Sequence, residues 1–364
     1  MKMVLVLEDG ACFEGESFGA KAEVCGWVHN DYRVVGYQET LTDPDNRGAL
    51  VNMTYPLIGN YGVNSEDGES ESAQAAALLV KERSRIVSNW RAEGSLDEWM
   101  ARGGVVGMDG VDTRTLALRL RDQGEMRGVI APAGAPVAEL LKKIRAYEIP
   151  PALELIRGAA SSGAHGGAFS ADGRYRVAVY DLGVRRSCLN QIEVGGCQAI
   201  RAPVTASWEE ISALKPEGLL IAGGPGDPRE LKDFFLQIKR ALGKLPIIGV
   251  ALGCQLLALA GGGRVGALKT GHRGVNYPVR QTASGRDGIT IQNHRFVIDA
   301  ESLAGTDFLV SHVNLNDGSV EGVAAERQEA AGVQFVPFPG DDGEPAELFR
   351  QFIGWMERRR KAGG

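Results

Sequence analysis

The feature that most constrains the fold is an uncharged stretch of 19 residues, from Leu245 to Gly263. It opens with a short apolar run typical of a buried strand and continues through a Gly-x-Ala-x-Gly pattern centred on Ala251. A helical run over residues 254–260 follows and is closed by three glycines. Glycines two residues before and after a central residue allow a strand to turn abruptly into a helix. The pattern therefore predicts a nucleophile elbow with Ala251 at its tip, where a methyl group cannot attack a substrate.

Two other interpretations of this stretch stay open on its residues alone. Its length and lack of charge suit a membrane span, but five glycines, Pro246 and Gln255 argue against one. An ordinary joint between a strand and a helix, with no link to catalysis, produces the same glycine spacing and is favoured for such a pattern taken alone. Residues elsewhere in the chain are needed to distinguish an ordinary joint from a nucleophile elbow.

The bulk composition is that of a soluble globular protein, with 44% hydrophobic and 24% charged residues in a chain of 364. This length allows two or three domains. A net charge of −6, with one basic cluster at residues 358–361, argues against nucleic acid as a partner. The N-terminus reaches Glu8 and Asp9 too early for a secretory signal, so we expect a cytoplasmic protein without a membrane anchor. Five scattered cysteines without a Cys-x-x-Cys pair predict neither disulfides nor a metal site.

The first domain is predicted to span residues 1–156. It begins with strands, and two runs at residues 36–45 and 54–64 are so dense in Gly, Pro, Asn and Asp that they predict turns rather than regular elements. Ser95, followed three residues later by Glu98, predicts the start of a helix. Residues 157–173 are rich in Gly, Ala and Ser and predict a linker.

The second domain, residues 174–364, is predicted to alternate strands and helices. Strict alternation indicates a mostly parallel sheet covered on both faces, with ligands at the carboxyl ends of its strands. The elbow and the glycine-rich loop at residues 223–228 both fall at that edge. Short extended pieces are predicted after residue 278. The expected strands lie at 176–181, 198–202 and 219–222, and the expected helices at 189–194, up to about 242, and 346–358.

Six runs of residues, in this order along the chain, resemble those of a known protein family. They are Leu-Val-Leu-Glu-Asp-Gly at 5–10, Gly-Tyr-Gln-Glu at 36–39, and the runs at 88–98, 112–116, 223–228 and 292–294. Together they resemble the small subunit of carbamoyl-phosphate synthetase. The N-terminal runs are the most specific, because other amidotransferases are similar only to the second half. The resemblance implies an α/β protein, with a mixed N-terminal domain and a C-terminal, mostly parallel-sheet, class I glutamine amidotransferase-like domain.

The same resemblance implies a function and a partner. In that family the small subunit hydrolyses glutamine and sends ammonia through a tunnel to a large subunit. The large subunit then uses ATP and bicarbonate to make carbamoyl phosphate. We therefore expect the large subunit as the partner, ATP and metal only on that subunit, and no cofactor in this chain.

The positions that correspond to the family's catalytic triad are all apolar here. The nucleophilic cysteine corresponds to Ala251. The family's Gln-x-His-Pro-Glu run reads Gln-Phe-Val-Pro-Phe at residues 334–338, so Val336 replaces the histidine base and Phe338 the orienting glutamate. A single lost residue could be an engineered substitution made to trap a substrate. Three substitutions are not needed for that purpose, because loss of the nucleophile alone lowers the rate by about 10⁶. We therefore expect a lost triad whose site is refilled by hydrophobic packing.

The positions that correspond to the family's glutamine pocket are partly retained. Two charged residues depart from the pattern, because Asp45 stands where the family has serine and Arg295 where it has glycine. We predict that Asp45 and Arg295 approach to within about 4 Å and fill the pocket as a charge-assisted pair. The alternative is that one or both point to solvent, where an exposed pair contributes little. The retained positions are Gly224, Gly226, Leu252, Gln255, Asn293 and Phe296.

Three functions are compatible with these residues. The leading one is an inactive glutaminase subunit that docks through its N-terminal domain and supports a large subunit using free ammonia, for pyrimidine or arginine synthesis. The alternative is a regulatory or ligand-binding pseudoenzyme independent of the synthetase. The third is a conventional glutamine-dependent enzyme, which would need Cys254 as nucleophile with His294 or His312 as base. Cys254 lies about 4.5 Å past the tip along the helix axis and is turned away from it, so we expect a packing residue.

Overall fold

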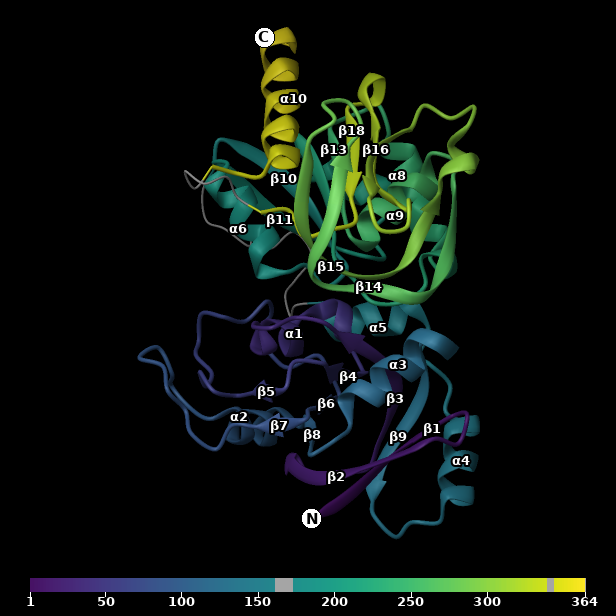
Figure 1. Cartoon of the computed structure of the whole chain (residues 1–364). Helices are drawn as coiled ribbons and strands as arrows, with labels where there is room; N and C mark the ends of the chain where they lie inside the picture. The colour runs from purple at the N-terminus through teal and green to yellow at the C-terminus, as the bar shows by residue number, and fades with distance from the viewer. Residues whose placement is uncertain (161–172, 339–343, 364) are drawn as a thin grey trace. The chain divides into compact units, whose positions relative to one another are not determined.

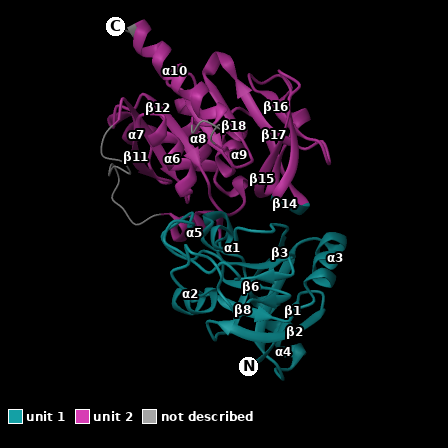
Figure 2. Ribbon diagram, turned by 60° about the vertical axis from the view of Figure 1, so that its left-hand side comes forward, with its two compact units in different colours: residues 1–150, 269–274 teal, residues 151–268, 275–364 magenta. Residues whose placement is uncertain are grey.

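A computed structural model describes residues 1–160, 173–338 and 344–363 of the chain. The chain divides into two compact units, coloured separately in Figure 2. Unit 1 comprises residues 1–150 and 269–274, and unit 2 comprises residues 151–268 and 275–364.

Unit 1 is built on a closed barrel of seven strands in the order β1-β2-β8-β6-β4-β3-β9. The pairs β3–β4, β4–β6 and β6–β8 are parallel, and the others are antiparallel. Fully buried side chains such as Leu5, Leu50 and Met108 form its core. Closure leaves no unpaired sheet edge. The strands are β1 (Lys2–Leu7), β2 (Cys12–Gly19), β3 (Val24–Asp31), β4 (Ala49–Met53), β6 (Ala77–Leu79), β8 (Val106–Asp109) and β9 (Met126–Pro132).

The predicted helix start at Ser95 is confirmed, because its hydroxyl accepts a hydrogen bond from the backbone N–H of Glu98 at 3.3 Å. The prediction of turns alone at residues 36–45 is wrong. This run forms α1 and η1 because Tyr37 is buried and stacks on Tyr61, with ring centroids 4.2 Å apart. The remaining elements of unit 1 are α1 (Tyr37–Thr42), η1 (Pro44–Asn46), β5 (Leu57–Ile58), β7 (Glu82–Arg83), α2 (Leu96–Gly103), α3 (Thr113–Gln123) and α4 (Val137–Ala146).

Unit 2 is built on a nine-stranded sheet in the order β11-β10-β12-β13-β18-β17-β15-β14-β16 (Figure 1). Its first five strands are parallel, which confirms the predicted parallel sheet, and the rest extend it antiparallel from β17. The strands are β10 (Tyr175–Asp181), β11 (Cys197–Pro203), β12 (Gly218–Ala222), β13 (Ile247–Val250), β14 (Arg264–Gln281), β15 (Asp287–Asp299), β16 (Leu309–Asn314), β17 (Val320–Ala325) and β18 (Ala330–Val333).

Helices cover both faces of this sheet. Along β10, Val177 and Val179 belong to one core cluster, while Ala178 and Tyr180 belong to the other, as the alternation of a strand requires. Helices α6 and α10 pack into the first cluster, and α5, α7, α8 and α9 into the second. The helical elements are α5 (Ala152–Ala159), α6 (Arg186–Val194), α7 (Trp208–Ala213), η2 (Pro228–Glu230), α8 (Lys232–Ala241), α9 (Leu252–Ala260), η3 (Ala300–Leu303), η4 (Glu326–Gln328) and α10 (Glu347–Gly363).

Two expectations differ from the structure. The pieces expected to be short after residue 278 include the end of β14 and the whole of β15, which are long strands whose alternation runs through polar residues and carries little hydrophobic signal. The strands β16, β17 and β18 are short, as expected. Helix α5 extends into the expected linker and belongs to unit 2, while residues 161–172 of that linker lie outside the described residues. The uncharged stretch at 245–263 is a strand and a short helix, and no helix among the described residues could cross a membrane.

A buried ion pair ties residues 269–274 into unit 1. The carboxylate of Glu125 lies 3.1 Å from Nε of Arg273 and accepts hydrogen bonds from Nε1 of Trp27 and the backbone N–H of Gly271. Burial opposes ionisation of Glu125, but the charge of Arg273, the nearby His29 and these hydrogen bonds outweigh it and lower its pKa to about 2. The segment 269–274 is therefore held in unit 1 by an ion pair that requires the carboxyl group of Glu125 to stay ionised.

We predict that Glu125→Gln destabilises unit 1 by about 3 kcal/mol at pH 7, because it leaves Arg273 buried without its counter-charge. A lowered folded-state pKa contributes stability that is complete above the unfolded value of about 4.5 and is lost as pH falls towards 2. The difference in the free energy of unfolding between wild type and variant, measured by urea unfolding, should shrink as the pH falls over that range. Glu139→Gln, at an exposed pair with Lys142, is the control and should change stability by less than about 0.5 kcal/mol. A pH-independent difference would contradict this account.

Candidate functional site

The predicted elbow is present at the junction of β13 and α9. Ala251 has φ 53° and ψ −120°, a backbone conformation that non-glycine residues rarely adopt. Its backbone N–H donates to the carbonyl of Val333 at 2.9 Å, which fixes the tip against the end of β18. The side chain at this position is a methyl group, and only 2% of the residue is exposed.

Both glycines of the elbow are required by close backbone contacts. A Cβ atom on Gly253 would lie 1.9 Å from the carbonyl oxygen of Ile221, and one on Gly249 would lie 2.6 Å from that of Gly253. Neither contact can be relieved by turning a side chain, because the opposing atoms are backbone. The spacing of these glycines is therefore explained by the geometry of the turn, and an ordinary joint without this constraint is disfavoured.

The two other triad positions have different environments. Val336 is buried and pairs with Ile291, to whose carbonyl its N–H donates at 2.9 Å. Phe338 is 51% exposed, so the expectation that hydrophobic packing refills all three positions is wrong for this residue. The physical reason is its place beyond the end of β18 and past Pro337, where the ring borders a surface cavity rather than the core.

Four of the retained pocket positions are brought together in pairs. A Cβ atom on Gly224, whose φ is 114°, would lie 2.7 Å from a methyl carbon of Leu252, so the glycine permits this close approach. The side chain of Gln255 donates to the carbonyl of Phe296 at 3.0 Å and to Oε1 of Gln334 at 2.9 Å. Both protons of this buried amide are therefore committed to protein acceptors rather than available to a ligand.

The other predicted site residues occupy separate places. Gly226 borders the start of α5, where an added Cβ would lie 2.6 Å from that of Ala152. Asn293 is buried and Arg295 half-buried on β15. Asp45 lies half-buried in η1 of unit 1. The pairing of Asp45 with Arg295 joins residues of different units, and it stays a prediction.

The environment of Cys254 argues against a replacement nucleophile. The residue is fully buried, and burial, followed by the negative charge of Glu321, raises the pKa of its thiol. Both ring nitrogens of His294, one candidate base, have other partners: Nδ1–H donates to the carbonyl of Phe296 at 3.0 Å, and Nε2 lies 3.3 Å from Oε2 of Glu321. A thiol held neutral in the core lacks the thiolate that attack requires.

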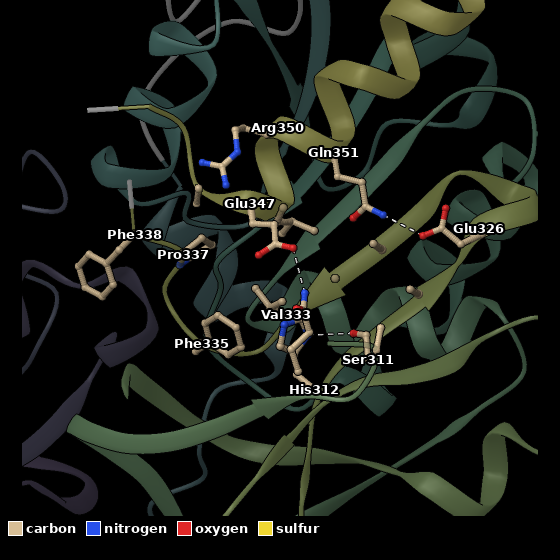
Figure 3. Close-up of a pocket in the computed structure, with 17 residues that line it drawn as sticks. Ser311, His312, Glu326, Val333, Phe335, Pro337, Phe338, Glu347, Arg350 and Gln351 are labelled. Atoms are coloured by element: carbon tan, nitrogen blue, oxygen red, sulfur yellow. Dashed lines mark hydrogen bonds between the residues drawn. The ribbon is translucent and has the colours of Figure 1, made fainter. Parts of the chain in front are cut away.

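The other candidate base, His312, lines a cavity of about 680 Å³ in unit 2. Burial lowers its pKa, Nδ1 lies 3.0 Å from Oγ of Ser311, and its ring meets that of Phe335 edge-on. Figure 3 shows these three residues facing Glu347 and Arg350 of α10. The cavity lining includes His312 and Phe338 but none of the six retained pocket positions, so this cavity is distinct from the predicted glutamine pocket.

Sequence reasoning missed this cavity and the buried acid beside Cys254. The cavity is formed by residues from β14, β16, β17, η4, β18, the run at 335–338 and α10, which lie far apart in sequence. Glu321 did leave a signal, because it is a single carboxylate inside the otherwise apolar strand β17. It accepts from Nδ2 of Asn314 at 2.9 Å, as a buried charge requires.

We predict that Ala251→Gly stabilises unit 2 by about 1 kcal/mol, because glycine adopts the positive φ without strain and the relief exceeds the entropy it adds to the unfolded chain. The matched control is Ala258→Gly in the middle of α9, where glycine should destabilise by at least about 1 kcal/mol. Denaturant unfolding measures both. Destabilisation by Ala251→Gly would show that the turn is not strained.

We further predict that iodoacetamide labels the exposed Cys12 in the native protein and labels Cys254 only after unfolding. Burial of the thiol and its raised pKa both suppress reaction. Peptide mapping by mass spectrometry resolves the two sites. Labelling of native Cys254 at a rate close to that of Cys12 would contradict this prediction and would support Cys254 as a replacement nucleophile.

Comparison with known proteins places the chain in a family. The family model for the carbamoyl-phosphate synthase small chain, CPSase domain, matches residues 5–130, and that for class-I glutamine amidotransferases matches residues 178–353. The carbamoyl phosphate synthase small chain of Listeria innocua is 40% identical over 357 residues, covering 98% of this chain and 97% of that protein. The pyrimidine-specific small chain of Bacillus subtilis is 37% identical over 365 residues, covering 100% and 98%. The chain therefore belongs to the family of carbamoyl-phosphate synthase small chains.

Proposed function

We propose that this chain is the small subunit of a carbamoyl-phosphate synthase in which it no longer hydrolyses glutamine, so that the large subunit uses free ammonia. The observation that carries the proposal is the alanine at the elbow tip, in the backbone conformation that presents a nucleophile. Val336 and Phe338 at the two other triad positions support it, because neither can accept a proton.

The chemistry of amide hydrolysis explains why these three residues matter. A thiol at the tip forms a covalent acyl intermediate, and an imidazole takes the proton from the thiol and returns it to the leaving amine. Loss of the nucleophile alone costs about 10⁶ in rate where the residues act as a unit. With neither group present, glutamine would be hydrolysed at a rate negligible beside synthesis from ammonia.

The partner in this proposal is a carbamoyl-phosphate synthase large subunit. Relatives that match the full length of this chain are named as small chains, which implies a large chain beside them. The N-terminal unit is the docking part in our proposal, because the runs at residues 36–39 and 88–98 keep the family pattern while the triad positions depart from it. ATP and its metal would then be bound by the large subunit.

The product would be carbamoyl phosphate for pyrimidine or arginine synthesis. The Bacillus subtilis relative is named pyrimidine-specific, which supports the first of these uses. The chain would act as a structural subunit that keeps its partner competent rather than as a source of ammonia.

The proposal is tested by carbamoyl phosphate synthesis with the purified pair, using glutamine freed of ammonium in one assay and ammonium in the other. We predict turnover with ammonium and none above background with glutamine. The ammonium rate of the same preparation is the control, because it shows that the large subunit is active. Glutamine-supported turnover comparable to the ammonium rate would refute the proposal, and the absence of any complex would favour a pseudoenzyme independent of the synthase.

A further inference from the structure

We propose that the Trp90 loop, defined as residues 84–92 between β7 and α2 of unit 1, anchors this chain on the large subunit, with the indole of Trp90 entering an apolar pocket of that partner. The identity of the partner rests on the function proposed above. The loop can be followed in Figure 1 between β7 and α2.

The loop exposes an unusual amount of apolar surface. Trp90 is 92% exposed and Ile86 75% exposed, and Val87 is also partly open to solvent. Single exposed apolar residues are normal, but a tryptophan and an isoleucine this open, four residues apart in one short loop, place a large apolar area in water. Tryptophan is among the residues that contribute most to the energy of protein interfaces. This surface is therefore suited to being covered by another protein.

The backbone of the loop is held in place in the absence of a partner. The N–H of Ser84 donates to the carbonyl of Ile58, and that of Ser88 to the carbonyl of Asn60, both at 2.8 Å. The N–H of Glu93 donates to the carbonyl of Val63 at 2.8 Å, just beyond the loop. Because the loop is already ordered, binding through Trp90 would cost little conformational entropy.

An acidic segment lies against the loop and defines the charge of the expected partner. The guanidinium of Arg91 lies 2.9 Å from Oε2 of Glu66 and 2.7 Å from Oδ1 of Asp67. These acids belong to residues 64–72, which also contain Glu69 and Glu71 and have no basic residue. The loop itself carries two cations, Arg85 and Arg91, against four acids in the segment 64–72, so only part of this negative charge is compensated. The partner surface should therefore surround its apolar pocket with lysine or arginine side chains.

The charge also disfavours a second copy of this chain as the occupant. In a symmetric dimer about Trp90, the same patch of each copy meets itself. The segment 64–72 of one copy would then lie near that of the other, with like charges opposed and a net charge of −6 on each chain. A different protein with a basic rim avoids this repulsion.

The test is the affinity of the large subunit for Trp90→Ala, measured by surface plasmon resonance or calorimetry. We expect the dissociation constant to rise at least about thirtyfold, the effect of losing an aromatic anchor. The matched control is Leu309→Ala, which truncates an apolar side chain that is 73% exposed on unit 2 and should leave the affinity within about twofold. Affinity for the wild type should also fall as salt rises, because the rim is charged.

A second readout separates docking from a role in folding. Excess Trp90→Ala chain should restore the ammonium-dependent turnover of the large subunit to the wild-type level, and its thermal unfolding should match wild type, because the removed side chain is almost fully in water. Wild-type affinity for Trp90→Ala would overturn the inference while leaving the proposed function intact. A wild-type chain that does not bind the large subunit would instead overturn the proposed function. A wild-type dimer that Trp90→Ala converts to a monomer would identify a second copy as the occupant.

Discussion

The structure of unit 2 depends on one tight turn, in which β13 ends and α9 begins at a single residue with positive φ. The turn is fixed by backbone contacts: two glycines allow the chain to pass close to Ile221 and to itself, and a hydrogen bond ties Ala251 to Val333 of the neighbouring strand. None of these contacts involves the side chain at the tip. The geometry of the elbow is therefore maintained by the sheet, whichever side chain stands at the tip.

The polar groups around the turn serve the scaffold. Gln255 joins Gln334 to the backbone at Phe296, and Glu321 is held by Asn314 close to His294. Buried polar groups must be hydrogen-bonded to be tolerated, so this network specifies how α9, β15 and β18 pack. Burial, followed by the negative charge of Glu321, raises the pKa of the Cys254 thiol and keeps it a neutral packing residue.

The sequence predicted those parts of the fold that have strong local signals. Glycine spacing located the elbow, and short apolar runs located the parallel strands, because buried strands have a continuous hydrophobic pattern. Features that depend on distant contacts were missed. Closure of the barrel in unit 1, helix α1 stabilised by Tyr61, and the exposure of Phe338 all arise from tertiary packing that composition does not encode. The cavity beside His312 was missed for the same reason.

The proposal that this chain forms no covalent intermediate with glutamine is tested most directly by the mass of the intact chain, after the complex has been incubated with glutamine and quenched in acid. A thioester with the substrate survives acid and adds the mass of the glutamyl group. An unchanged mass is predicted, because the position that presents a nucleophile carries only a methyl group. A glutamyl adduct on any residue of this chain would contradict the account.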